Sequence, residues 1–180
     1  MSLPAAYLQL VQALDQLPAV GPRAAARLAQ HLLNSSDGHA LMQALQRAGS
    51  ELQQCRQCRH YSSTALCGVC SNEQRDASRW LVVAGVDELQ QAEQAGWRGQ
   101  YFVLHGLLAP MSGRGPNQLG LDQLQQRVVA AARPLQITLA LESTAEGRAT
   151  GAFITSMLAT AGVELVLQDW TEWLTAQEQA

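Results

Sequence analysis

All four cysteines of this 180-residue chain lie in one short stretch. They form two Cys-x-x-Cys pairs, Cys55 with Cys58 and Cys67 with Cys70. Each short turn aims both of its sulfur atoms at one point, so two such pairs predict a tetrahedral structural zinc site made of four thiolates. Four thiolates leave no open coordination position, and we therefore expect no catalysis at the metal.

Two other uses of the cysteines stay open, namely disulfides and a redox-active dithiol. The chain does not begin with a charged segment followed by an apolar one, so we expect a cytoplasmic protein, in a compartment where disulfides do not persist. A redox dithiol normally needs only one pair. His60 is close enough in sequence to replace a cysteine, but four cysteines suffice, and we expect His60 to face solvent.

The basic residues are all arginines, and they are concentrated in the first half of the chain. Residues 1–80 hold seven arginines against five acidic residues, whereas residues 81–180 hold five against ten. Because the formal net charge is −3, binding to nucleic acid would depend on a local arginine cluster and not on overall charge. No apolar run is long enough to span a bilayer.

The sequence LPAVGPR at residues 17–23 predicts a tight turn between two amphipathic helices, and a third helix then runs into the cysteines. In this turn we expect Gly21 to take a positive φ and Pro22 to begin the second helix. The arrangement is that of a helix-hairpin-helix, whose turn and first helical amides face a DNA phosphate. Arg23 and Arg27 share one helical face, so we predict that they and Gly21 contact the DNA backbone. The alternative is a helical hairpin with solvated arginines.

After the cysteines, apolar runs alternate with amphipathic segments. The runs at residues 80–84, 101–104, 136–141 and 163–167 predict strands, and the segments between them predict helices. This alternation predicts a mainly parallel sheet, with its functional loops at the carboxyl ends of the strands. Glu142 and Glu146 in one of these loops would either hold Mg²⁺ or act as ordinary loop and cap charges.

The last segment places Trp170, Trp173 and Leu174 on one helical face. Such an aromatic stripe either packs against its own domain or binds a partner.

A helix-hairpin-helix, a four-cysteine motif and an alternating α/β domain, in this order, resemble the bacterial RecR family of recombination mediators. The resemblance covers roughly residues 5–167. Beyond the turn and the cysteines, it is carried by YFVLHG at residues 101–106, by Gly115-Pro116 and Gly120-Leu121, and by TAEG at residues 144–147.

The resemblance implies an α+β chain of several modules and a function in DNA repair. We expect a helix-hairpin-helix domain at residues 1–54, a four-cysteine zinc motif at 55–71, a Toprim-like α/β domain at 72–168 and an atypical tail at 169–180. The family is not enzymatic. It assembles into dimers and ring-like tetramers and works with RecO, and in many bacteria RecF, to load recombinase on single-stranded DNA at the nucleoid.

The resemblance also suggests roles for individual residues. Arg23 and Arg27 fall where the family presents basic residues to DNA, and Glu146, with Glu142 beside it, falls on an acidic position implicated in contacting RecO. Toprim enzymes carry an acidic residue after the first strand, where this chain has Ala84, so the sequence speaks against a metal-dependent nuclease or primase.

The family continues past the fourth strand with a Gly-x-Pro-x-Gly segment that helps to join subunits, and this chain has a different tail from residue 169. We therefore expect a shortened relative that forms a dimer rather than a tetrameric ring. An alternative function is that of an interaction or modulatory paralogue without loading activity.

Overall fold

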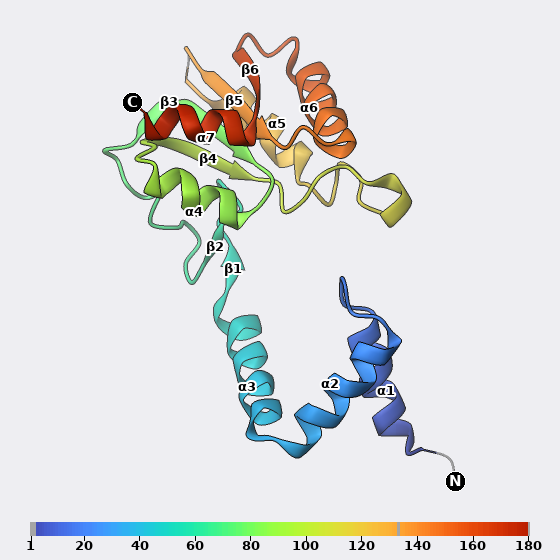
Figure 1. The fold of residues 1–180 in the computed structure, drawn as a ribbon. Coiled ribbons are helices and arrows are strands. Elements are labelled where there is room, and N and C mark those ends of the chain that lie inside the picture. Colours follow the sequence, from blue (N-terminus) through green and yellow to red (C-terminus); the bar gives the residue numbers. More distant parts are fainter. Residues whose placement is uncertain (1–2, 133, 180) are drawn as a thin grey trace. The chain divides into compact units, whose positions relative to one another are not determined.

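The structure of the chain, a computed structural model, describes residues 3–132 and 134–179. The chain divides into two compact units, Met1–Leu52 and Gln53–Ala180, and each is described by itself (Figure 1). The cysteines therefore belong to the same unit as the α/β fold. The finer division into four modules stays a prediction, and its terminal residues 1, 2 and 180 lie outside the described residues.

The first unit consists of three helices. These are α1 (Ala5–Asp15), α2 (Pro22–Asn34) and α3 (Ser36–Glu51). Pro22 begins α2 as predicted, since its fixed φ suits the first helical position. The expected positive φ at Gly21 is wrong: Gly21 is extended, with φ −94°, and Ala19 is left-handed, with φ 62°. A proline restricts the residue before it to extended conformations, which moves the sharp turn to Ala19.

The second unit contains a small ribbon and a four-stranded sheet. The strands are β1 (Gln53–Gln54), β2 (Tyr61–Ser62), β3 (Asp76–Val83), β4 (Gly99–Val103), β5 (Gln136–Leu141) and β6 (Glu164–Asp169). The helices are α4 (Val86–Gln94), the 3-10 turn η1 (Pro110–Ser112), α5 (Leu121–Ala130), α6 (Ala145–Leu158) and α7 (Trp170–Glu178). The antiparallel ribbon of β1 and β2, which the sequence did not predict, surrounds the first cysteine pair.

The four-stranded sheet has the order β4-β3-β5-β6, and all its pairs are parallel, which confirms the predicted topology. β3 begins at Asp76 rather than at Trp80. The first half of β3 is exposed, and its register with β4 shifts between Asp76 and Trp80. This half was not predicted because it lacks the apolar run that is typical of a buried strand.

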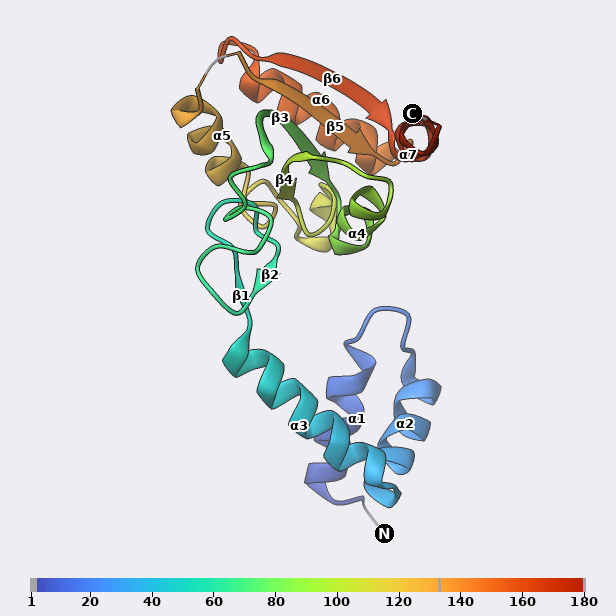
Figure 2. The same ribbon diagram turned by 90° about the vertical axis from the view of Figure 1, so that its left-hand side faces the viewer.

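Helices cover both faces of this sheet (Figure 2). On one face Val82, Phe102 and Leu139 pack against α5 and α6. On the other face Leu81 and Val103 pack against α4 and α7, and three of the cysteines join this second core. The four-cysteine segment is thus built into the hydrophobic core of the α/β unit.

α7 packs on its own domain, which resolves the two roles considered for the aromatic stripe. The Asp169 side chain accepts hydrogen bonds from the backbone N–H groups of Thr171 and Glu172, so the helix begins directly after β6. Trp173 stacks on Trp170 at 5.3 Å between ring centroids and meets Trp97 edge-on at 5.6 Å. Trp173 is 3% exposed, so this face is part of the core.

The helices that the structure describes include none that is long and apolar enough to cross a membrane.

The tryptophan cluster makes a prediction about stability. Trp173→Ala should lower the free energy of unfolding by about 3–5 kcal/mol, because it removes a buried indole and leaves a cavity between Trp97 and Trp170. Denaturant unfolding measures the loss. Met111→Ala is the control, since the Met111 side chain is fully exposed and its removal should change the free energy by less than about 0.5 kcal/mol. Equal effects of the two substitutions would contradict the packing of α7.

Candidate metal centre and nucleic-acid interface

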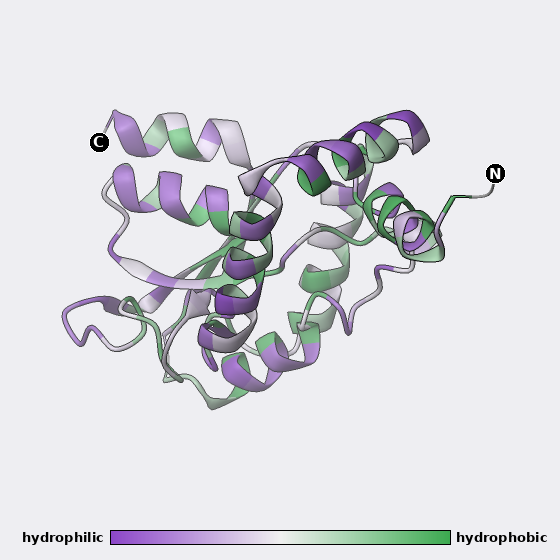
Figure 3. Cartoon of the chain, turned by 90° about the horizontal axis from the view of Figure 1, so that it is seen from below, coloured by the Kyte–Doolittle hydropathy of each residue, from purple (hydrophilic) through white to green (hydrophobic). Residues whose placement is uncertain are grey.

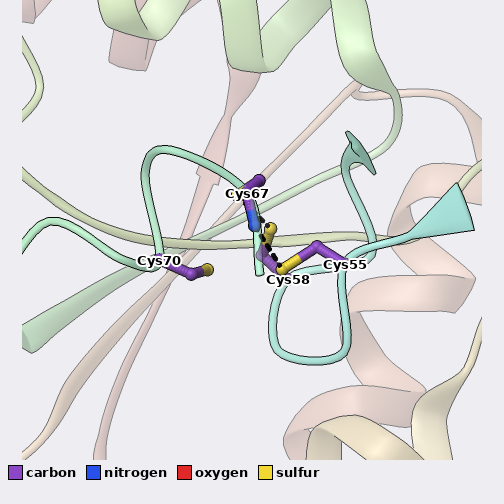
Figure 4. Close-up of side chains that lie close together, drawn as sticks. All are labelled: Cys55, Cys58, Cys67 and Cys70. Atoms are coloured by element: carbon purple, nitrogen blue, oxygen red, sulfur yellow. Dashed lines mark hydrogen bonds between the residues drawn. The ribbon is translucent and has the colours of Figure 1, made fainter. Parts of the chain in front are cut away.

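The four cysteine side chains converge on one point (Figure 4). Their sulfur atoms all lie within 4.8 Å of one another, and the Sγ atoms of Cys58 and Cys67 are 3.4 Å apart. A zinc ion with bonds of about 2.3 Å separates its ligand sulfurs by about 3.8 Å, so the cluster has the dimensions of a tetrathiolate site. All four are free thiols, which leaves the disulfide alternative without support. Among the described residues, no other group of three or more His, Cys, Asp or Glu converges in this way.

The surroundings of the sulfur atoms favour a single thiolate, at Cys67, because the pKa of both Cys58 and Cys70 is raised by their hydrogen bonds within the cluster and by burial. The backbone N–H groups of His60 and Cys67 donate to the Sγ atoms of Cys58 and Cys55 at 3.4 and 3.3 Å. The hydrogen bond between Cys58 and Cys67 lowers the pKa of Cys67 and raises the pKa of Cys58 to about 12. A second thiolate in this cluster therefore needs a cation, which a bound metal ion would supply.

His60 is not a member of the cluster, as expected, but it does not face solvent freely. It is half-buried, and its Nδ1 atom is buried without a hydrogen-bond partner in the described part of the chain. The backbone carbonyl of His60 accepts the N–H of Cys55 at 2.8 Å, and this hydrogen bond closes the first cysteine turn.

The first cysteine turn, residues 55–59, is fastened to the α/β fold through its backbone carbonyls. The N–H of Val103 in β4 donates to the carbonyl of Cys58 at 2.9 Å, so the turn lies against the end of this edge strand. The α5 side chains Gln123 and Arg127 donate to the carbonyls of Arg56 and Gln57. One backbone N–H and two side chains that are distant in sequence therefore help to place Cys55 and Cys58.

Arg127 has a second electrostatic role beside the cysteines. Its guanidinium stacks on the Trp80 ring at 4.0 Å from the centroid and donates to the carbonyl of Tyr101 at 2.6 Å. Burial lowers the pKa of Arg127, and the four nearby sulfur atoms oppose this shift. A zinc tetrathiolate at this cluster would carry a formal charge of about −2, which the cation of Arg127 would partly balance.

The carboxyl ends of the strands form an open depression of about 740 Å³. It brings together the predicted loops, since Ala84, His105, Glu142 and Glu146 all line it. Its further lining residues are Tyr61, Gly85, Asp87, Glu88, Gly106, Leu107, Ala109, Arg114 and Thr144. Four carboxylates against one arginine make this surface acidic.

A tight turn positions the two predicted glutamates. Glu146 lies in the first turn of α6, where the Thr144 hydroxyl accepts the N–H of Gly147 at 3.0 Å. A side chain at Gly147 would collide with the carbonyl of Glu142, so only glycine permits this turn. Glu142 and Glu146 are both exposed at the rim of the depression.

The structure places the predicted DNA-contacting residues at the beginning of α2. Gly21 is the residue before the helix, and Arg23 and Arg27 follow in its first turns, all three exposed. α2 contains no acidic residue in its first turn, and no side chain caps its N-terminus. The free amides and the two guanidinium groups therefore lie at the same end of the helix.

Several residues that position the metal centre were not predicted. Arg59, Gln123 and Arg127 hold the cysteine turn, but each acts through a carbonyl or a ring that is distant in sequence. An arginine directly after a Cys-x-x-Cys pair was the only local indication.

Comparison with known proteins agrees with this architecture. Residues 7–49 match the family described as RecR, helix-hairpin-helix, and residues 78–167 match the Toprim domain. The chain is 42% identical over 158 residues to the Recombination protein RecR of Alcanivorax borkumensis, an alignment that covers 86% of this chain and 78% of the relative. The resemblance inferred from the sequence is confirmed, and the chain belongs to the RecR family of recombination proteins.

Proposed function

We propose that this chain is a non-enzymatic mediator of recombinational repair that binds the DNA backbone and helps RecO-like, and in some settings RecF-like, partners to load recombinase on single-stranded DNA. The observation that carries the proposal is the pair of exposed arginines, Arg23 and Arg27, at the free N-terminus of α2 in the region that matches the RecR helix-hairpin-helix. Guanidinium groups and free helical amides bind phosphate whatever the base sequence, as a loading protein requires.

The second part of the proposal is a structural zinc ion held by Cys55, Cys58, Cys67 and Cys70. The convergence of the four sulfur atoms within 4.8 Å supports it, together with the two amide hydrogen bonds to sulfur. When bound, zinc supplies a fixed tetrahedral junction between the two cysteine turns and no reactive position.

The third part is a basic protein partner at the acidic depression. Glu142 and Glu146 lie at its rim, and Asp87 and Glu88 at the start of α4 add two more carboxylates. DNA phosphates would be repelled here, whereas arginine and lysine side chains of a protein would be attracted. The absence of an acidic residue at Ala84 argues against Toprim metal chemistry at the same place.

The fourth part is assembly through the helical unit. Among its described residues only Ala25 and Ala29 are buried. Figure 3 shows hydrophobic positions interspersed with hydrophilic ones along the helices near the N-terminus. The exposed large apolar side chains of this unit are Leu3, Leu8, Leu17, Leu28, Leu33, Leu41, Met42, Leu45 and Leu52. A unit of about 50 residues with so small a core is marginal alone, and a second copy would cover these side chains. The same surface would serve a modulatory paralogue that assembles with a relative.

DNA binding is tested by replacing both arginines of α2. Arg23→Ala with Arg27→Ala should weaken binding to single-stranded DNA, and the slope of log K against log salt should become less steep by about 1.4, since each arginine neutralises one phosphate and each phosphate of a single strand contributes about 0.7. A fluorescence anisotropy titration at several salt concentrations measures both effects.

The control for this experiment is Arg47→Ala, which removes an exposed arginine from α3 of the same unit. It should leave the slope unchanged. If the double variant retained the wild-type slope, the DNA surface would not be at the start of α2.

Metal binding is tested at the first cysteine. Cys55→Ser should weaken zinc binding by more than about 100-fold. Loss of a residue that only orients a metal ligand already lowers the metal affinity by about 10- to 100-fold, and loss of a ligand itself should lower it further. Competition with a chromogenic zinc chelator measures the affinity. The control is Ser63→Ala, an exposed position between the two pairs, which should retain one zinc per chain. An unchanged affinity of the Cys55 variant would mean that the four sulfur atoms do not form the site.

A further inference from the structure

One side chain, Arg59, links the four-cysteine turn to the loop between β4 and α5, residues 104–120. The side chain is buried, with 7% of the residue exposed. Its Nη1 donates to the carbonyls of Leu104 and Leu119, and its Nη2 donates to that of Gln118 at 3.0 Å. These carbonyls lie at the two ends of the loop, so the guanidinium holds the base of the loop closed.

The backbone of Arg59 is held equally firmly on the cysteine side. Its N–H donates to the carbonyl of Cys55 at 2.9 Å, which makes Arg59 the last residue of the cysteine turn. Its own carbonyl accepts the Nε2–H of His105, at 2.7 Å. The carbonyl can only accept, so this contact identifies Nε2 as the protonated ring nitrogen.

Both partners of this hydrogen bond have a left-handed backbone. Arg59 has φ 63° and His105 has φ 59°. A residue with a Cβ atom loses about 1–2 kcal/mol in this conformation, and it persists only where surrounding contacts impose it. The two strained residues therefore support each other, and the contact between the cysteine turn and the loop is a built feature of the fold.

Gly120 provides the space that the Arg59 guanidinium occupies. A Cβ atom at Gly120, which has φ 66°, would collide with this guanidinium. The end of the loop and the side chain from the cysteine turn thus fit together closely.

The loop in turn contacts the residues of the acidic depression. The N–H of Gly106 donates to the carbonyl of Ala84 at 2.8 Å. The N–H of Leu108 donates to the Thr150 hydroxyl at 2.9 Å, and that hydroxyl donates to the carbonyl of Glu146 at 2.6 Å. The loop backbone thus connects Arg59, which bonds to the ends of the loop, with Ala84 and with the backbone of Glu146.

We propose that Arg59 is a positioning residue that makes the conformation of residues 104–120, and with it the acidic depression, depend on the metal occupancy of the four-cysteine centre. A bound metal fixes the turn at residues 55–59 and so holds Arg59 in the loop. Removal of the metal frees the turn, and Arg59 withdraws from the carbonyls. The inference rests on the proposed zinc site. Because the coupling between two binding events is reciprocal, a partner that binds only the ordered loop would also raise the affinity for zinc.

Hydrogen–deuterium exchange read by mass spectrometry tests this coupling on the full chain, with zinc content measured on the same samples. In the wild type, chelation should accelerate exchange at least about tenfold in residues 104–120 as well as in residues 53–71, since a charge-assisted hydrogen bond is lost. Arg59→Ala should exchange rapidly in residues 104–120 while it retains one zinc per chain, and chelation should add nothing further there.

The matched control is Arg56→Ala, which removes an exposed arginine from the same turn and should exchange like the wild type. Gly120→Ala offers a second test that leaves Arg59 and the cysteines intact, and it should accelerate the loop with zinc still bound. If the wild type binds zinc but exchange in residues 104–120 is the same before and after chelation, the coupling is wrong and the zinc site stands. The same holds if the Arg59 and Gly120 variants bind zinc and exchange in residues 104–120 like the wild type. A wild-type chain that binds no zinc would overturn the zinc proposal and the coupling together.

Discussion

The hydrogen bond from the N–H of Val103 to the carbonyl of Cys58 joins the four-cysteine segment to the sheet of the second unit. It attaches the first cysteine turn to the end of the edge strand β4, and α5 secures the same turn through Gln123 and Arg127. The turn thereby covers one end of a strand whose outer backbone groups would otherwise be open to other chains. Because Cys55 and Cys58 are fully buried in the core with α4 and α7, the four-cysteine cluster is part of the sheet's packing.

The two units differ in the chemistry that they present. The helical unit exposes arginines and free amides at the start of α2, which suits a polyanion. The α/β unit gathers four carboxylates at the carboxyl ends of its strands, which suits a basic protein surface and repels phosphate. If DNA and a basic partner bind as proposed, the opposite charges direct them to different surfaces of the chain.

The sequence predicted those features that depend on neighbouring residues. Cysteine spacing identified the cluster, the alternating apolar runs identified the parallel sheet, and Pro22 identified the beginning of α2. The left-handed residue of the turn was predicted at Gly21 and not at Ala19, because glycine is the residue that most often takes a positive φ. Pro22 restricts Gly21, the residue before it, to an extended conformation.

The residues that support the four-cysteine cluster could not be predicted, for a different reason. Arg59 bonds to carbonyls of Leu104, Gln118 and Leu119, which are brought to it by the folded sheet. Carbonyls are present at every residue and leave no pattern in the sequence. The exposed first half of β3 was missed because it has no apolar alternation.

The central claim is that the four-cysteine centre and the α/β fold form one cooperative unit that a bound metal stabilises. Differential scanning calorimetry of the full chain, with zinc and after chelation, tests it most directly. We expect the transition of the α/β unit to move to lower temperature as a whole when zinc is removed, since a metal that binds only the folded state stabilises everything that unfolds with its site. An α/β transition at the same temperature with and without zinc would contradict it.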